Sequence, residues 1–424
     1  MNMPTESVSV GADPSAPPDA ADTPQVPVPG RWFTRFGLAW LGIWMAYLVP
    51  AQLTLPDQLD RIDHAGRIHD FAIVNGAAGI AAVVTLPLFG ALCDRTRSRF
   101  GRRRVWVVYG LAVMCVGLVA TGFAMDWQEV MATWVFTTLG FNMMTVGITA
   151  AAADAVPESQ RGRVSTSMFA PQGIGVVLGL AALTPIQDDR LRYAVLGVAV
   201  AAFGWPFARR FRDVVSRQPL PPLGVRSVLE GLWISPRKRP EFAWAFGSRL
   251  MMNLANVLAT CYLLFFLRDS LKVSDPDQGL LILTAVYLVF TLLATYGGTK
   301  LAERLGRRRV FVAGSAVSQA IACVLIVCAP SFDLALVAGA FLGIGYGAYM
   351  AVDQVVIMKL LPEARDRAKD LAIMNVGAFV PATFGPLPAS LLIDRLGGYP
   401  ALFVSAALVS ALGAVMIYRV KSVR

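Results

Sequence analysis

One acid and one base stand inside long apolar stretches of the sequence, and they are the residues whose chemistry is hardest to explain as packing. Asp353 lies within the apolar run 334–358, and Arg249 lies within the run 242–267. An ionised side chain inside a bilayer is costly unless it is paired or wet. Each is the one residue of its sign that lies clearly within such a run, so together they predict an ion pair.

The two positions also agree in depth if both runs are helices. Arg249 follows Glu241 by eight residues, about 12 Å along a helix, and Asp353 precedes Pro362 by nine residues, about 13 Å. While the pair is in contact, the guanidinium favours a charged carboxylate; when the pair parts, desolvation favours the neutral acid. The arrangement predicts either a proton switch or a permanent salt bridge that holds the helices together.

Other chemistry finds little support in the sequence. His64 and His69 share one loop, and two ligands do not make a zinc site. Gly343, Gly345 and Gly347 lack phosphate-loop spacing and a following Lys-Ser/Thr pair, so they predict close helix packing. The cysteines form no CxxC pair and are interpreted as small core residues, namely Cys93, Cys115, Cys261, Cys323 and Cys328. We expect no cofactor, no metal and no catalytic residue, and a polytopic membrane enzyme is a remote alternative.

The composition predicts a membrane protein. Of the 424 residues, 56% are hydrophobic and 16% are charged, whereas a soluble domain has about 45–50% apolar and about 25% charged residues. The apolar runs are about twice as long as the strands of a membrane barrel, which favours helices. Twelve spans are expected, at 35–54, 71–93, 105–124, 130–153, 165–186, 191–208, 242–267, 279–300, 310–329, 334–358, 371–393 and 399–418.

The cations predict the orientation of these spans. With the N-terminus in the cytoplasm, thirty of the 38 Lys and Arg residues fall on the cytoplasmic side and seven fall outside. This asymmetry follows the positive-inside rule and places both termini in the cytoplasm. The net charge of +10 is therefore assigned to membrane loops and not to a nucleic-acid surface. We expect a multi-pass protein of the cytoplasmic membrane.

An internal repeat divides the chain into two halves. Gly101-Arg-Arg-Arg-Val105 recurs as Gly306-Arg-Arg-Arg-Val310, and Pro157-Glu158 recurs as Pro362-Glu363 at the same offset. Two matches at one offset indicate homologous halves. The expected organisation is a disordered cytoplasmic tail 1–30, a six-helix half 31–211, a cytoplasmic linker 212–240, a second six-helix half 241–418 and a tail 419–424.

The loop between the second and third runs resembles the signature loop of the major facilitator superfamily. Its matching residues are Gly90, Asp94, Arg95, Gly101, Arg102 and Arg103. The second half repeats the pattern more weakly, with Thr299 at the first glycine position, followed by Glu303, Arg304, Gly306, Arg307 and Arg308. The resemblance implies an all-α membrane protein with twelve transmembrane helices in two pseudo-symmetric six-helix halves. It also implies secondary transport by alternating access and a monomer.

The resemblance implies a gating role for this loop. Asp94 is expected beside the N-terminus of helix 371–393, where a helix dipole favours an anion, and Glu303 beside the start of helix 165–186. The loop is lengthened, and in this form it is similar to that of glycoside–pentoside–hexuronide and sucrose–proton symporters. Melibiose-type symporters carry acids in the second helix, whereas the run 71–93 has none. This difference favours export over sugar uptake.

The resemblance further implies that the runs 35–54, 130–153, 242–267 and 334–358 line a central cavity. Residues at offsets 0, 4, 7 and 11 share one face of a helix, and polar or aromatic residues occupy such faces. The candidates are Trp40, Trp44, Tyr47, Thr138, Asn142, Thr145, Asn253, Asn256, Tyr346 and Tyr349, together with Gln354 and Asn375. Ordinary hydrogen bonding between helices is the alternative interpretation of the same faces.

The sequence therefore predicts a secondary active transporter of a small organic molecule, coupled to protons. Export of a drug or metabolite is favoured, and uptake of a sugar or glycoside is the alternative. A transporter-like sensor without flux is a third possibility. The expected partners are the small-molecule substrate, protons and the lipid bilayer, with no nucleic acid.

Overall fold

The computed structural model describes residues 27–98, 100–211, 240–305, 308–328, 331–360 and 367–420, and every regular element in these ranges is a helix. Residues 212–239 of the predicted linker 212–240 and most of both predicted tails lie outside these residues. Within the described ranges, twelve helical segments are long and apolar enough to cross a membrane, so the predicted all-α membrane fold is confirmed.

The first six crossings are formed by α1 (Gly30–Val49) with η1 (Pro50–Thr54) and α2 (Leu55–Ile62), α3 (Arg67–Arg95), α4 (Arg102–Phe123), α5 (Trp127–Ala155), α6 (Arg161–Leu183) and α7 (Asp189–Arg210). The short turn η2 (Glu158–Gln160) precedes α6. The other six are formed by α9 (Pro240–Thr260) with α10 (Leu263–Asp269), α11 (Pro276–Leu305), α12 (Arg308–Cys328), α13 (Phe332–Leu360), α14 (Arg367–Phe384) with α15 (Pro386–Arg395), and α16 (Gly398–Tyr418).

Helix α3 begins four residues earlier than the sequence predicted. It therefore includes Asp70, which is buried in the first turn. The statement that the second helix contains no acid is wrong, because Asp94 also lies within it, in its last turn. Asp70 is at the end of the helix and not at its middle, but the argument for export that used this absence is weakened.

The first crossing is not a uniform α-helix. A five-residue π-helical segment, η1, begins at Pro50 and joins α1 to α2. Proline has no backbone N–H and disturbs the α-helical hydrogen-bond ladder, and π segments occur as local bulges within helices. The wider turn changes the direction in which the residues of α2 project.

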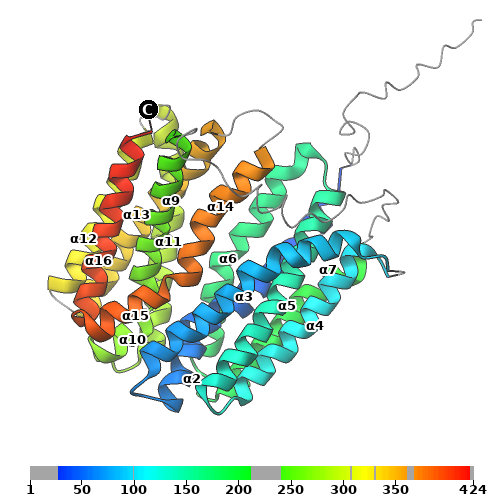
Figure 1. The fold of residues 1–424 in the computed structure, drawn as a ribbon, viewed down its shortest axis with the longest axis horizontal. Helices are drawn as coiled ribbons and strands as arrows, with labels where there is room; N and C mark the ends of the chain where they lie inside the picture. The colour runs from blue at the N-terminus through cyan, green and yellow to red at the C-terminus, as the bar shows by residue number, and fades with distance from the viewer. Residues whose placement is uncertain are drawn as a thin grey trace, which may run out of the picture.

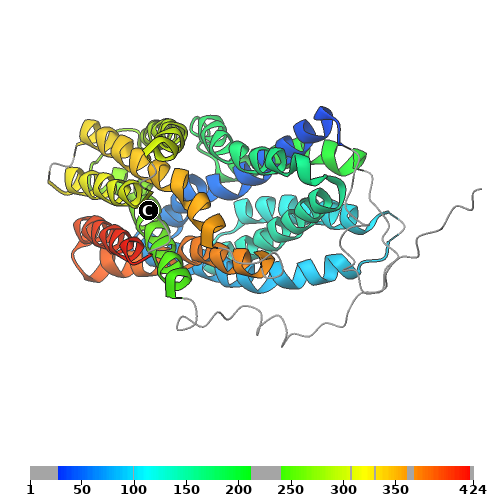
Figure 2. The ribbon, with the colours of Figure 1, turned by 90° about the horizontal axis from the view of Figure 1, so that it is seen from above.

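The two halves pack their helices in the same pattern. In the first half α1 contacts α6 and α7, α4 contacts α5 and α7, and α3 contacts α5. In the second half α9 contacts α14 and α16, α12 contacts α13 and α16, and α11 contacts α13. Figures 1 and 2 show these halves side by side, meeting where α3 contacts α14 and α15 and where α6 contacts α11.

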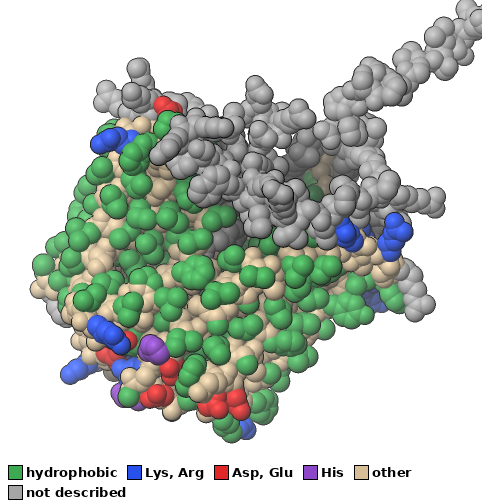
Figure 3. Space-filling model, viewed as in Figure 1, with side chains coloured by type: hydrophobic (Ala, Val, Ile, Leu, Met, Phe, Trp, Pro, Cys, Tyr) green, Lys and Arg blue, Asp and Glu red, His purple; other side chains and the backbone are tan. Residues whose placement is uncertain are grey.

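The flank of the bundle is apolar. Figure 3 shows hydrophobic side chains over the visible sides of the helices, with the charged side chains toward the two ends of the bundle. Large exposed apolar residues on the outer helices include Val116, Leu292 and Leu408. Exposed apolar side chains on every outer helix need a lipid environment, so the chain is a multi-pass membrane protein.

The cysteines follow the predicted core role only in part. Cys93 and Cys323 are buried, Cys115 and Cys261 are half-buried, and Cys328 is exposed at the end of α12. All five are free thiols. The interpretation as core residues is wrong for Cys328, because α12 lies on the outside of its half and turns that position outward.

Candidate functional site

Helices α9 and α13 bring Arg249 and Asp353 into direct contact. The guanidinium Nη1 of Arg249 donates to Oδ2 of Asp353, and both side chains are only 8% exposed. Arg249 lies nine residues after the start of α9, about 14 Å along the helix. The predicted pairing of the two residues is therefore present, well inside the second half.

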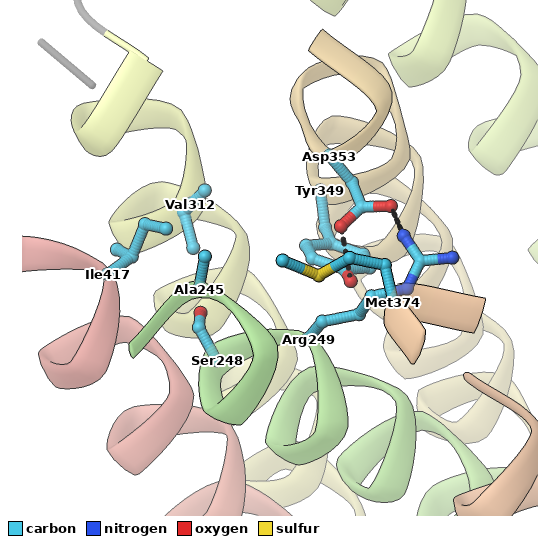
Figure 4. Close-up of a pocket in the computed structure, with 8 residues that line it drawn as sticks. All are labelled: Ala245, Ser248, Arg249, Val312, Tyr349, Asp353, Met374 and Ile417. Carbon is cyan, nitrogen blue, oxygen red and sulfur yellow. Dashed lines mark hydrogen bonds and ion pairs between the residues drawn. The ribbon is translucent and has the colours of Figure 1, made fainter. Parts of the chain in front are cut away.

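Tyrosine and asparagine side chains extend this pair into a hydrogen-bonded chain. Tyr349, one turn before Asp353 on α13, donates its hydroxyl to Oδ1 of Asp353 at 2.9 Å. Asn253, one turn after Arg249 on α9, donates to the Tyr349 hydroxyl at 3.3 Å and accepts from the Tyr346 hydroxyl at 3.3 Å. Both oxygens of Asp353 thus have donors (Figure 4).

A small cavity adjoins the pair. Its lining comes from five helices, with Ala245, Ser248, Arg249, Val312, Tyr349, Asp353, Met374 and Ile417 around it (Figure 4). The cavity has a volume of about 10 Å³, which is about the room that one water molecule needs. Buried Nε of Arg249 has no hydrogen-bond partner among the described residues. The site therefore has a spare donor and space for water.

Small residues allow the helices to close around this site. A Cβ at Gly377 on α14 would lie 3.5 Å from Cγ of Arg249, and a Cβ at Gly345 on α13 would lie 2.7 Å from the backbone oxygen of Ser315 on α12. Only glycine permits the second approach, so the close packing predicted for the glycines of α13 is present.

The remaining cavity candidates separate into two groups. Five are buried between helices, and one of them, Asn142, donates its amide to the Thr85 hydroxyl of α3 at 2.7 Å. The buried group comprises Trp40, Thr138, Asn142, Asn253 and Tyr349. The half-buried group, which retains accessible surface, comprises Trp44, Tyr47, Thr145, Asn256 and Tyr346.

The half-buried aromatic residues of α1 form a stacked group with α5. Tyr47 stacks on Phe141 with ring centroids 4.0 Å apart, and Trp44 lies 6.0 Å from the same ring. The indole of Trp44 also donates to the backbone oxygen of Met168 on α6 at 2.9 Å. This group gives the first half a rigid aromatic surface, whereas the second half contributes the polar chain around Asp353.

Several predicted residues cannot be placed. The structure does not describe the side chains of Gln354 and Asn375, nor those of Glu303, Arg304 and Arg308 in the second copy of the loop motif. Gly306 and Arg307 of that copy lie outside the described residues.

Comparisons with known proteins identify the family. The model of the Major Facilitator Superfamily matches residues 32–268 and 245–424. The chain belongs to the Major Facilitator Superfamily. The fold is similar to that of a point mutant of the nucleoside transporter NupG, with a TM-score of 0.71, 12% sequence identity and coverage of 92% of this chain and 99% of that one. Because it belongs to this superfamily, the chain is a transporter of small molecules across a membrane and not an enzyme.

A curated relative gives a shorter match. The chain is 28% identical over 131 residues to "Multidrug resistance protein Stp" of Mycobacterium tuberculosis (strain CDC 1551 / Oshkosh). The match covers 30% of this superfamily member and 24% of the relative. The chain thus spans about a quarter of the length of the curated relative that it matches.

The superfamily signature loop forms ion pairs within its own half. Arg103, at the start of α4, donates to Asp94 at 2.5 Å and to Asp154 at 2.8 Å, which ties α4 to the ends of α3 and α5. Arg102 also contacts Asp154, at 3.1 Å. The side chains at the start of α14 lie outside the described residues, so the contact expected there for Asp94 stays a prediction.

The sequence did not single out a second group of buried charges. Arg192 is fully buried, and Asp57 and Asp277 are 4% and 7% exposed. Asp353 and Arg249 are therefore not the only buried acid and base among the described residues of this superfamily member. The three missed residues lie within one turn or two of a helix end, where charges normally reach water, so their positions gave no signal.

Proposed function

We propose that the protein is a proton-coupled exporter of small organic molecules in the cytoplasmic membrane, monomeric, with both termini in the cytoplasm. Secondary transport follows from the family. Proton coupling is supported chiefly by one observation, the buried contact of Arg249 with Asp353 and Tyr349. The orientation is supported by the distribution of Lys and Arg along the sequence.

The coupling proposal uses the two states of Asp353. As a carboxylate it accepts hydrogen bonds from both Arg249 and Tyr349. As a neutral acid it no longer attracts the guanidinium, and Arg249 becomes available to a substrate or to water in the adjoining cavity. Binding of a proton and binding of substrate would then alternate at one site, which is the requirement for exchange of the two.

Two observations bear on the direction of transport. The similarity to a protein named for multidrug resistance favours export, and the aromatic surface of Trp44, Tyr47 and Phe141 suits planar apolar compounds. The same rings also stack on sugars, and the polar chain of Asn253 and Tyr346 suits hydroxyl groups. Uptake of a sugar or glycoside is therefore the second candidate.

The test measures accumulation of labelled compounds, both planar antibiotics and sugars, in a host that lacks its own efflux pumps. Wild type is compared with Asp353→Asn, which removes the proton site but keeps the size of the side chain. Asp333→Asn is the matched control, because Asp333 lies exposed in the first turn of the same helix, α13.

We expect wild type and Asp333→Asn to lower the accumulation of at least one compound, and Asp353→Asn to lose this effect. Purified protein in vesicles should then move the compound against its gradient when a pH gradient is imposed, and Asp353→Asn should not. Higher accumulation of a sugar in the wild type would reverse the direction. Pumping that Asp353→Asn leaves unchanged would eliminate proton coupling through this residue.

A further inference from the structure

A cluster of ion pairs joins the two halves at the end of the bundle away from the termini, the lower end in Figure 1. We call it the distal lock. Its four members are Asp57 on α2 and Arg192 on α7 from the first half, and Arg268 on α10 and Asp277 on α11 from the second half. Asp57 reaches this boundary from beyond the π segment at Pro50.

Each arginine of the lock contacts a carboxylate in both halves. Across the boundary, Arg192 Nη2 donates to Asp277 at 2.5 Å, and Arg268 Nη2 donates to Asp57 at 2.5 Å. Arg268 Nη1 also donates to Asp60 of the first half at 2.6 Å. Within each half, Arg192 Nη1 contacts Asp57, and Arg268 Nη2 lies 3.8 Å from Asp277. The four charges sum to zero in each half and in the whole cluster.

Because the side chains of the lock are largely buried, breaking their contacts is costly in free energy. The side chains of Arg192 and Asp57 are 0% and 5% exposed, and those of Asp277 and Arg268 are 10% and 26% exposed. A charge that is buried without a partner is strongly destabilising, whereas an exposed ion pair contributes little. A movement that parts the halves can therefore occur only if each arginine keeps a partner.

A second set of contacts closes the same boundary beside the lock. Arg67 at the start of α3 donates to Asp269 of the second half at 2.7 Å, and Tyr399 donates to the other oxygen of Asp269 at 2.7 Å. The hydroxyl of Tyr262 lies 3.1 Å from backbone oxygens of both halves, at Ile68 and Pro386. These contacts thus hold the two halves together beside the lock.

A polar cavity of about 450 Å³ opens next to the lock. Asp57, Arg268 and Asp277 contribute to its wall, together with Ser274 and Gln187. Water in this cavity can solvate the charges of the lock as soon as they separate, which lowers the cost of opening.

We infer that the distal lock is a gate that splits along the boundary between the halves by exchange of partners. Opening breaks the contacts of Arg192 with Asp277 and of Arg268 with Asp57 and Asp60. It leaves Arg192 with Asp57, Arg268 with Asp277, and Asp60 with Arg67 of its own half. No arginine is stranded in either state. The lock stabilises the conformation that is closed at the distal end, and this role depends on neither proton coupling nor the direction of transport.

The test is a distance measurement between spin labels at the distal end, in protein whose five native cysteines are replaced. Met125 in the first half and Leu396 in the second are 70% and 66% exposed and lie outside the lock, so each is replaced by a labelled cysteine. Arg268→Ala removes cross-boundary contacts, and Asp277→Asn removes one charge with little change of shape. Pulsed electron resonance then gives the populations of short and long distances.

Arg61→Ala is the matched control. Arg61 pairs with Asp189 at the same end of the molecule, but both belong to the first half. We expect a single short distance in the wild type and in Arg61→Ala. In Arg268→Ala and Asp277→Asn the ratio of long to short distances should rise by about tenfold, the effect of losing hydrogen bonds from a charged group.

Three results would each overturn the inference. The first is a wild type that already populates mainly the long distance. The second is an unchanged distribution in both lock variants, and the third is an equal shift in Arg61→Ala. Because Asp277→Asn is nearly isosteric, it keeps the test decisive if Arg268→Ala fails to fold. Failure of the transport assays with Asp353→Asn would leave the expected distances unchanged, so the two proposals can fail separately.

Discussion

Neutralising Asp353 alone should destabilise the protein more than neutralising both members of its ion pair. In Asp353→Asn the buried guanidinium of Arg249 loses its counter-charge, because both side chains are only 8% exposed. Removal of one partner from a buried pair costs about 3–5 kcal/mol. In the double variant Arg249→Gln/Asp353→Asn two amides face one another without charge, and we expect most of that loss to be recovered.

The assay is reversible unfolding of the purified protein by SDS, followed through the fluorescence of its nine tryptophans. The two single variants and the double variant form a thermodynamic cycle, whose coupling free energy we expect to reach about 2–3 kcal/mol. The control is Arg61→Gln with Asp189→Asn, a pair in which Arg61 is 46% exposed. Its coupling should stay below about 1 kcal/mol.

The same double variant separates the two interpretations of the pair. If the pair is only a structural salt bridge, the double variant should regain both stability and transport. If Asp353 carries the proton, the double variant should regain stability but still fail to pump against a gradient. A coupling free energy near zero would refute the argument itself, because it would mean that the two charges are solvated independently.

Three other changes test the packing and the ion pairs. Arg103→Lys should destabilise the first half by about 1–3 kcal/mol in the same unfolding assay, because lysine cannot bond Asp94 and Asp154 together in the way that the planar guanidinium does. Gly345→Val should cost at least about 1–3 kcal/mol, since its side chain would meet the backbone of α12. Asn142→Ala should cost about 1–2 kcal/mol by loss of the bond to α3, and transport by the folded fraction should persist if Asn142 serves packing alone.

The fold could be predicted from the sequence because its signals are long and repeated. Twelve apolar runs, an excess of cations on alternate loops and a repeat at one offset all reflect the bilayer, which acts on every helix in the same way. The pair of Arg249 and Asp353 could be predicted for a related reason. A charge deep within an apolar run is so costly that it must have a partner. Each of these two residues had only the other as a residue of opposite charge clearly within an apolar run.

Neither the distal lock nor the burial of each polar or aromatic helix face could be predicted in this way. Charges near helix ends are ordinary, so Arg192 and Asp277 carried no signal until the two halves were seen in contact. Helical periodicity places Trp40 and Trp44 on one face, but it does not say which neighbour covers that face. The structure buries the first and leaves the second half-buried.

The two ionic groups differ in what must move to separate them. Arg192 and Asp277 belong to different halves, so a rocking movement of rigid halves is enough to part them. Arg249 and Asp353 both belong to the second half, on α9 and α13, so rigid rocking leaves their contact intact. Proton exchange at Asp353 therefore requires something more local, either a shift of α9 against α13 or a ligand that competes for Arg249 in the adjoining cavity. If the ligand supplies that competition, then substrate binding is what frees the carboxylate, and coupling follows from the chemistry of the site without any contact between the two halves.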